Sequence, residues 1–390
     1  MISGVLVAIS LICVFVIGYG MVGYPLLLKV IELIKRPTDN KKDLSYEPMV
    51  SYMIVAHNEE KVIKEKLENA LRLDYPCDKL QIIVASDNST DNTNLLVEEF
   101  IKDNSTRNII LYCSKEHKGK TNAQNEAQKM ANGEILVMTD ANTMIKPDAI
   151  RELVSYYTAP EIVYVCGKLE YSNATSNATS QSEATYWDLD LSMRDIESRI
   201  WTITAGNGAL YSCKNEEYID FEPISCHDSI MPYTYSKQGK RALFNPRAIA
   251  VEKAGETDED EYKRKVRMNR DILDMISKGV RVINPFKYKW FSIFYFGHRT
   301  CRYLLWLAHI ILFISTGILS VMRYKMWMIL FVAQMLFYIM SILVIVLKMN
   351  NSVLRLVGYY GMTIFAQIHG VFNIITGRSK PVWEKAESTR

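Results

Sequence analysis

The two ends of this 390-residue chain are strongly apolar, and this feature most constrains how the chain folds. No charged residue occurs before Lys29, and residues 5–28 form an apolar run long enough to cross a bilayer. The run is too long for the core of a cleavable signal peptide, and no basic segment precedes it. Basic residues cluster directly afterwards, within residues 35–42. The positive-inside rule therefore predicts one N-terminal membrane helix followed by a cytoplasmic domain.

Two further apolar runs, residues 303–321 and 327–347, predict membrane helices near the other end. Residues 354–375 contain several polar side chains, so they fit either a further span or a helix lying at the membrane interface. Residues 286–296 mix aromatic residues with lysines, a composition that fits an amphipathic helix at the level of the lipid headgroups or the start of a membrane span. We therefore expect a multi-pass protein of the cell membrane that contacts its lipids.

The composition between the ends is that of an ordinary α/β domain. The 46 basic and 43 acidic residues nearly balance, which gives no support for a nucleic-acid surface. Seven cysteines occur without a C-x-x-C pair, so neither a disulfide framework nor a structural zinc site is expected. The expected parts of the chain are a membrane helix at 1–36, a catalytic domain at 47–285, an interface helix with membrane helices at 286–376, and a tail at 377–390.

Apolar runs alternate with amphipathic stretches through the middle, which predicts a mostly parallel sheet covered by helices. The expected strands are residues 49–56, 80–86, 109–113, 134–139 and 162–168. The expected helices are residues 60–73, 92–103, 121–131, 147–157, 186–198, 229–237 and 258–278. The repetitive stretch 172–181 predicts a polar loop.

Polar residues follow three of the expected strands, at the point where each strand ends. They are the segments His57-Asn58-Glu59-Glu60, Asp87-Asn88-Ser89-Thr90-Asp91 and Asp140-Ala141-Asn142. Each segment alone is equally explained by helix capping or by a loop. Open α/β sheets bind ligands beyond the carboxyl ends of their strands, so the three together favour a nucleotide-and-metal site.

On an ordered set of motifs the chain resembles the family 2 glycosyltransferases, the group that includes cellulose, hyaluronan and poly-N-acetylglucosamine synthases. The resemblance runs from about residue 50 to residue 268. The motifs are Val55-Ala56-His57-Asn58-Glu59-Glu60, Asp87-Asn-Ser-Thr-Asp91, Lys118-Gly-Lys120-Thr-Asn-Ala-Gln-Asn125, Asp140-Ala-Asn142, His227-Asp228 and Arg264-Lys-Val-Arg267. Several motifs in the expected order are far more specific than one. The resemblance implies a GT-A-type nucleotide-sugar-binding domain and transfer from a UDP-sugar.

The resemblance also implies roles for donor-binding residues. The residues placed around the base, ribose and diphosphate of the donor are Ala56, His57, Asn58, Glu59, Asp87, Lys120, Asn125, Asp140, Arg264 and Arg267. Two arginines three positions apart share one face of a helix, so both are suited to the charge of the departing diphosphate.

The segment Asp140-Ala-Asn142 stands where the family has the D-x-D motif that binds a divalent cation, Mg²⁺ or Mn²⁺. Hard cations prefer oxygen ligands, and a cation on the diphosphate neutralises the leaving group. Asn142 offers an amide oxygen but no charge. The resemblance therefore implies a metal site that depends mainly on Asp140.

Asp228 stands at the position of the family's catalytic base, which an inverting transfer requires on the acceptor side. An N-cap role is the alternative for Asp228, and packing is the favoured role for His227. Trp187, Glu197 and Gly206 are expected on the acceptor side.

The leading hypothesis is addition to a growing saccharide in cell-surface or exported polysaccharide synthesis. Single addition to a lipid-linked acceptor and a non-catalytic nucleotide-binding scaffold are the alternatives. Met268 replaces the aromatic residue that processive members of the family carry, which favours single addition, whereas the arrangement of the membrane helices favours a synthase.

Overall fold

The computed structural model describes residues 2–173, 178–255, 257–349 and 351–382. The chain divides into two compact units. The sheet unit contains residues 37–174, 187–255 and 380–390, and the helical unit contains residues 1–36, 175–186 and 256–379. The segment 256–285, expected in the catalytic domain from the sequence, is assigned here to the helical unit.

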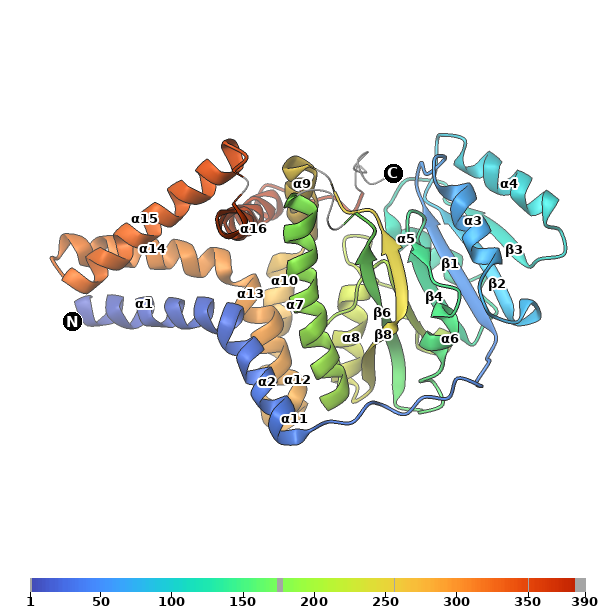
Figure 1. The fold of residues 1–390 in the computed structure, drawn as a ribbon, viewed down its shortest axis with the longest axis horizontal. Coiled ribbons are helices and arrows are strands. Elements are labelled where there is room, and N and C mark those ends of the chain that lie inside the picture. Colours follow the sequence, from blue (N-terminus) through green and yellow to red (C-terminus); the bar gives the residue numbers. More distant parts are fainter. Residues whose placement is uncertain (1, 174–177, 256, 350, 383–390) are drawn as a thin grey trace. The chain divides into compact units, whose positions relative to one another are not determined.

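The sheet unit is built around one sheet, whose strands order as β3-β2-β1-β4-β7-β6-β8-β5 (Figure 1). The strands are β1 Val50–Ala56, β2 Leu80–Ser86, β3 Ile109–Cys113, β4 Ile135–Asp140, β5 Met144–Ile145, β6 Ile162–Tyr171, β7 Leu210–Lys214 and β8 Arg241–Glu252. β3, β2, β1 and β4 are parallel neighbours, as are β6 and β8. β7 runs antiparallel to β4 and β6, and β5 antiparallel to β8. The predicted mostly parallel sheet is confirmed, with a mixed second half.

Helices cover both faces of this sheet because successive strand side chains point to opposite faces. Tyr52 and Ile54 of β1 pack in one apolar cluster, and Met53 and Val55 pack in another. The helices of the sheet unit are α3 Ile63–Leu71, α4 Thr93–Asp103, α5 Lys120–Gln128, α6 Ala149–Val154 and α8 His227–Lys237, together with most of α7 Ala178–Ile200. α3, α4 and α6 contribute to the first cluster, and α5, α7 and α8 to the second.

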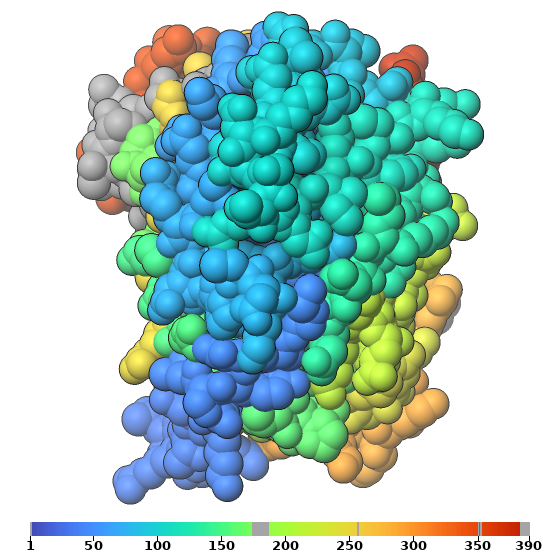
Figure 2. All heavy atoms as spheres, turned by 90° about the vertical axis from the view of Figure 1, so that its right-hand side faces the viewer, coloured from blue at the N-terminus to red at the C-terminus, as the bar shows by residue number. Residues whose placement is uncertain are grey.

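The connections bring several strand ends to one edge. α3, α4 and α5 link consecutive parallel strands, so the carboxyl ends of β1, β2 and β4 point the same way. Since β7 is antiparallel to β4, with Leu210 opposite Thr139, β7 begins where β4 ends. Figure 2 turns the β3 side of the sheet toward the viewer, with α4 and β3 in cyan near its centre. The edge where β4 ends and β7 begins carries the candidate site.

The helical unit begins with α1 Ile2–Gly18, a π-helical turn Tyr19–Gly23 and α2 Tyr24–Lys35, and the chain bends between α1 and α2 (Figure 1). Its remaining helices are α9 Asp258–Met268, α10 Ile272–Arg281, α11 Pro285–Tyr288, α12 Trp290–Phe294, a π-helical segment Tyr295–Thr300, α13 Cys301–Tyr303, α14 Leu305–Val321, α15 Lys325–Val346 and α16 Ser352–Ile375. The expected helix 258–278 is thus two helices, because the chain turns at 269–271. The expected amphipathic helix 286–296 is broken at Lys289, which has a φ of 51°.

Within the described residues, Ile2–Lys35 and Lys325–Val346 are long and apolar enough to cross a membrane. Trp290–Tyr303 and Leu305–Val321, bent by 59°, form one further span if the pair is counted together. Polar side chains join these helices: Ser10 Oγ lies 2.7 Å from Ser315 Oγ, and Thr316 Oγ1 lies 3.0 Å from Gln334 Oε1. Such contacts are a common means of packing helices in lipid.

The predicted polar loop at 172–181 is only partly present. α7 begins at Ala178, so the end of that stretch is helical instead. Residues 174–177 lie outside the described residues.

Candidate active site

The ends of β1 and β2 are joined by hydrogen bonds to the loop before α5. The Asp87 carboxylate is fully buried and accepts from Lys118 N at 3.1 Å, Gly119 N at 2.7 Å and His117 Nδ1 at 2.8 Å. His57 Nδ1 lies 2.7 Å from the Asp87 carbonyl oxygen, and the His57 and His117 rings stack at 3.7 Å. Asp87 therefore fixes this loop, and the half-buried His57 ring stacks on the His117 ring. Their contacts to a donor stay a prediction.

Ala56, Asn58 and Glu59 form the turn that follows β1. Ala56 and Glu59 are buried, and Asn58 adopts a positive φ of 55°. Asn58 Oδ1 accepts from Thr90 N at 2.7 Å, and Glu59 N donates to Thr93 Oγ1 at 2.7 Å. These bonds tie the turn to the loop after β2, so the capping alternative accounts for part of what these residues do.

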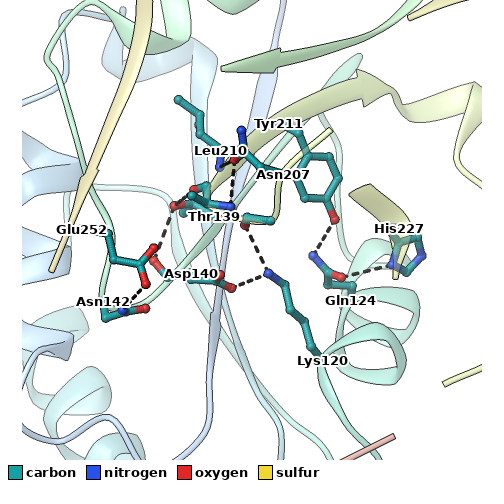
Figure 3. A network of polar contacts seen from close by, with 12 residues as sticks. Lys120, Gln124, Thr139, Asp140, Asn142, Asn207, Leu210, Tyr211, His227 and Glu252 are labelled. Atoms are coloured by element: carbon teal, nitrogen blue, oxygen red, sulfur yellow. Dashed lines mark hydrogen bonds and ion pairs between the residues drawn. The ribbon is translucent and has the colours of Figure 1, made fainter. Parts of the chain in front are cut away.

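Lys120, Asp140 and Asp228 meet around Gly208, just before β7 (Figure 3 shows the Lys120–Asp140 contact). Lys120 Nζ forms an ion pair with Asp140 Oδ1 and donates to Gly208 O at 3.2 Å. A Cβ at Gly208 would lie 2.9 Å from Lys120 Nζ, 3.7 Å from Asp140 Oδ2 and 3.9 Å from Asp228 Cγ. The position of the missing Cβ, here called the space at Gly208, is therefore closely bordered by one ammonium and two carboxylates. Three predicted site residues are thus brought together from α5, β4 and α8.

The charges in this group shift one another's pKa values. Burial, together with the Asp140 carboxylate, raises the pKa of Asp228, although Lys120 and Arg194 oppose the shift. Burial alone would lower the pKa of Lys120, but Asp140 and Asp228 outweigh it and hold that pKa above its usual value. Asp228 is therefore a stronger base than an exposed aspartate, as proton abstraction from a hydroxyl requires.

Asn125 and His227 belong to a neighbouring network behind Lys120. Asn125 Nδ2 donates to Phe221 O at 2.9 Å, and Tyr218 Oη donates to Asn125 Oδ1 at 3.0 Å. The buried His227 ring lies 3.1 Å from Gln124 Oε1 and 2.9 Å from Tyr218 Oη. Burial lowers the pKa of His227 to about 3, so the ring is neutral and packs. Asn125 fixes the segment that leads into α8.

Side chains of α3 hold the segment after β4 through hydrogen bonds. Lys66 is fully buried, and its Nζ donates to Thr139 Oγ1 at 3.2 Å and to the carbonyl oxygen of Thr143. Asn69 Nδ2 donates to Ile145 O at 2.9 Å, and Ile145 N donates back to Asn69 Oδ1 at 3.0 Å. Burial lowers the pKa of Lys66 to about 7. These bonds fix the backbone on both sides of Asp140-Ala-Asn142.

The resemblance implies a divalent cation, and the side chains after β4 fit one. Asp140 presents Oδ2 toward the space at Gly208, and Asn142 Nδ2 donates to Glu252 Oε1 at 3.0 Å, which leaves the amide oxygen of Asn142 for another partner. Carboxylate and amide oxygens suit Mg²⁺ and Mn²⁺. No group of three or more His, Cys, Asp or Glu side chains gathers as a metal site anywhere in the part of the chain that the structure describes.

Gly206, Glu197 and Trp187 lie on the α7 side of this group. Gly206 N donates to Asp228 O at 2.8 Å, which connects the predicted acceptor-side turn to the predicted base. Glu197 is fully buried on α7. On the same helix the Arg194 guanidinium binds Asp190 at 2.6 Å and lies 5.6 Å from the Trp187 ring.

Arg264 and Arg267 belong to α9 of the helical unit. Arg264 forms an ion pair with Glu261 at 2.7 Å, and Met268 is half exposed. Their contacts to the donor stay a prediction.

Four further residues were missed by the sequence analysis: His117, Gly208, Lys66 and Glu252. His117 and Gly208 lie next to recognised motifs in the sequence, so their positions could have indicated that they belong to the site. Lys66 is one of many lysines on an amphipathic helix, and Glu252 is separated from Asn142 by 110 positions. For those two residues the sequence alone contains no signal.

Comparisons with known proteins agree on the family of the sheet unit. The family described as Glycosyl transferase family 2 matches residues 51–218. The beta-monoglucosyldiacylglycerol synthase of Nostoc sp. is 27% identical over 195 residues, 47% of this chain and 42% of that protein. The poly-beta-1,6-N-acetyl-D-glucosamine synthase of Staphylococcus aureus is 22% identical over 289 residues, 72% of this chain and 68% of that protein. The match thus spans less than half of the first of these relatives.

A solved structure resembles nearly the whole chain. The mannosyltransferase of Pyrobaculum calidifontis, in complex with GDP-Man and Mn²⁺, has a TM-score of 0.73 at 20% identity and covers 96% of this chain and 99% of that one. At this identity the likeness shows the fold, which is of the GT-A type.

Proposed function

Because the chain carries a family 2 glycosyltransferase domain on a GT-A-type fold, we propose that it is an inverting glycosyltransferase that uses a UDP-sugar. The acceptor is a growing saccharide of a cell-surface or exported polysaccharide, and the enzyme works at the cytoplasmic face of the membrane. The observation that supports this proposal most is the convergence of Lys120, Asp140 and Asp228 around the space at Gly208.

The reaction needs a base on one side of the anomeric carbon and positive charge on the other. Asp228 takes the proton of an acceptor hydroxyl, whose oxygen then attacks the anomeric carbon as the bond to the diphosphate breaks. The raised pKa of Asp228 suits this step. Lys120 holds positive charge for the departing phosphate oxygens, and it exchanges Asp140 for the diphosphate when the donor binds. A single displacement of this kind inverts the anomeric configuration.

Asp140 and Asn142 are the residues that would hold a divalent cation, which when bound supplies further positive charge to the diphosphate. His57 and Asp87 lie at the neighbouring strand ends, where the nucleoside is expected. The structural neighbour bound to Mn²⁺ holds a guanine nucleotide, so donors of both nucleotides are worth testing.

A second candidate is single addition to a lipid-linked acceptor. It is favoured by the few candidate spans in the described residues and by a relative named for a glucosyldiacylglycerol product. Both candidates place the acceptor at a membrane, so the product separates them.

The test is nucleotide release from a panel of UDP- and GDP-sugars by the full chain in lipid nanodiscs, with Mn²⁺ or Mg²⁺. Asp228→Asn is the inactive variant, and Asp220→Asn, an exposed carboxylate before the same helix, is the matched control. Release that is lost only in Asp228→Asn supports the proposal, and the product's length then distinguishes polymer from single addition. Metal-dependent nucleotide binding without release, even with lipid-linked acceptors supplied, would identify a scaffold instead.

A further inference from the structure

Strand pairing places Glu252 beside the segment Asp140-Ala-Asn142. β5 follows that segment directly and pairs with β8, with Met144 opposite Val251. Glu252 is the next residue of β8 and its last. The carboxylate thus reaches the segment from a strand that is distant in sequence, as Figure 3 shows.

The contact between Asn142 and Glu252 depends on Asn142 not being an aspartate. Asn142 Nδ2 donates to Glu252 Oε1 at 3.0 Å. A second carboxylate at position 142 would accept no hydrogen bond from Glu252 and would repel it at this distance. Position 142 thus carries an amide where the adjacent strand β8 supplies a carboxylate.

Lys66 is the buried amine on which the charges of Asp140 and Glu252 act. Its buried Nζ binds Thr139 and Thr143, the residues that flank the segment, and the charges that act on it come from Asp140 and Glu252. A buried amine that faces two acids offsets part of their mutual repulsion in the absence of a cation. Both carboxylates thus act on one buried amine, and the Oδ2 atom of Asp140 lies on the side of Gly208.

We propose that Glu252 is the second carboxylate ligand of the divalent-cation site, in place of the one absent at position 142. Asp140 and Glu252 supply the two carboxylates, the amide oxygen of Asn142 is a further ligand, and Nδ2 of Asn142 orients Glu252. This assignment rests on the proposed function, because the diphosphate completes the coordination of the cation.

The test is Mn²⁺ affinity rather than turnover. The full chain in nanodiscs is titrated with Mn²⁺ in the presence of UDP, or GDP where UDP does not bind, and free Mn²⁺ is followed by its electron paramagnetic resonance signal. Glu252→Gln keeps an oxygen that accepts from Asn142 but removes the charge. Glu170→Gln is the matched control, since Glu170 lies on the paired strand β6 and forms its own ion pair with Lys168 at 2.9 Å.

We expect Glu252→Gln to weaken Mn²⁺ binding at least about tenfold, whereas Glu170→Gln leaves it unchanged. Asn142→Asp in the Glu252→Gln background is expected to recover most of the loss, because it returns the carboxylate to the D-x-D position. Melting temperatures of all variants confirm that they fold.

Equal Mn²⁺ affinity in Glu252→Gln and the unaltered chain would overturn the assignment and leave Glu252 as a hydrogen-bond partner of Asn142. Equal weakening by Glu170→Gln would overturn it as well, because general charge would then explain the effect. Absence of any Mn²⁺-dependent nucleotide binding in the unaltered chain is a separate result, and it would refute the proposed function itself.

Discussion

Replacing Gly208 with alanine tests whether the space beside Lys120 and Asp140 is used. The new Cβ would lie 2.9 Å from Lys120 Nζ, whereas ordinary contacts begin near 3.4 Å. Gly208 is not among the glycines with positive φ, so alanine fits the backbone. The lysine end is the part that gives way, by about half an ångström, and it loses its bond to the Gly208 carbonyl and its alignment with Asp140.

The expected size of the effect follows from that lost alignment. A hydrogen bond to a charged group contributes about 1.5–3 kcal/mol. Since about 1.4 kcal/mol corresponds to a tenfold change, kcat/KM is expected to fall about 10- to 150-fold. The melting temperature should fall less than in Gly206→Ala, because the Lys120 side chain is 21% exposed and its end can shift toward solvent.

Gly206→Ala is the informative contrast within the same turn. Its Cβ would lie 2.0 Å from the hydroxyl of Tyr164, which is fully buried. Overpacking of this kind costs about 1–3 kcal/mol or more, so Gly206→Ala should lower the melting temperature as well as activity. Nucleotide-release assays and thermal melts on both variants check the pair. Unchanged kcat/KM in Gly208→Ala would refute the view that the space belongs to the reaction.

Three further predictions concern single residues. Asp228→Asn should lower kcat about 10²- to 10⁴-fold. In the unaltered enzyme, kcat/KM should begin to fall at a higher pH than it would with an exposed aspartate as base, because the pKa of Asp228 is raised. A pH–rate profile of both enzymes checks these two expectations. Lys66→Met should destabilise the sheet unit by about 1–3 kcal/mol by leaving the Thr143 carbonyl and the Thr139 hydroxyl without their hydrogen-bond donor. The pKa of Lys66 is about 7 in the folded chain and about 10.4 in the unfolded chain, so the unfolded chain binds more protons between these values. The contribution of Lys66 to the free energy of unfolding should therefore rise with pH across that window, as melts at pH 7 and pH 9 would show. Gly119→Ala should lower the melting temperature and weaken nucleotide binding, because Gly119 has a φ of 98° and its Cβ would lie 2.7 Å from Pro381 O.

The first half of the sheet was predicted closely because β1, β2 and β4 are buried on both faces and β3 is a short apolar run between polar segments. β2 and β3 have the expected bounds, β1 starts one residue later than expected, and β4 is shifted by one residue at both ends. Such strands appear in a sequence as continuous apolar runs between polar turns. The signal is local, so it needs no knowledge of the strand's neighbours.

In the second half only β6 was predicted, at residues 162–168, because the signals of β7, β8 and β5 are not local. β8 contains the exposed residues Pro246 and Arg247, and its pairing with β6 shifts register between Gly167 and Lys168. That irregularity hides the alternation that marks a strand. Glu252 reaches Asn142 only through this pairing, so its place in the site follows from the fold.

The same distinction divides the candidate site. Asp87, Asp140 and Lys120 were predicted because motifs place them at strand ends or a helix start. Their partners, such as His117 for Asp87, come from the tertiary arrangement. The predicted residues therefore indicate the type of reaction, whereas their contacts in the fold determine which of their atoms remain to bind a ligand.

The reversed direction of β7 has a consequence for how such an enzyme changes its substrates. The chain leaves the sheet at the ends of β1, β2 and β4, but it arrives at the sheet along the turn that holds Gly206 and Gly208. Under the proposed roles, donor and acceptor are therefore expected to be bound by separate stretches of chain that share one edge. Changes in the arriving stretch, between α7 and β7, can alter the acceptor while the departing loops retain the donor. If the acceptor binds this stretch as proposed, a library confined to residues 201–207 should exchange acceptors and leave the nucleotide site intact.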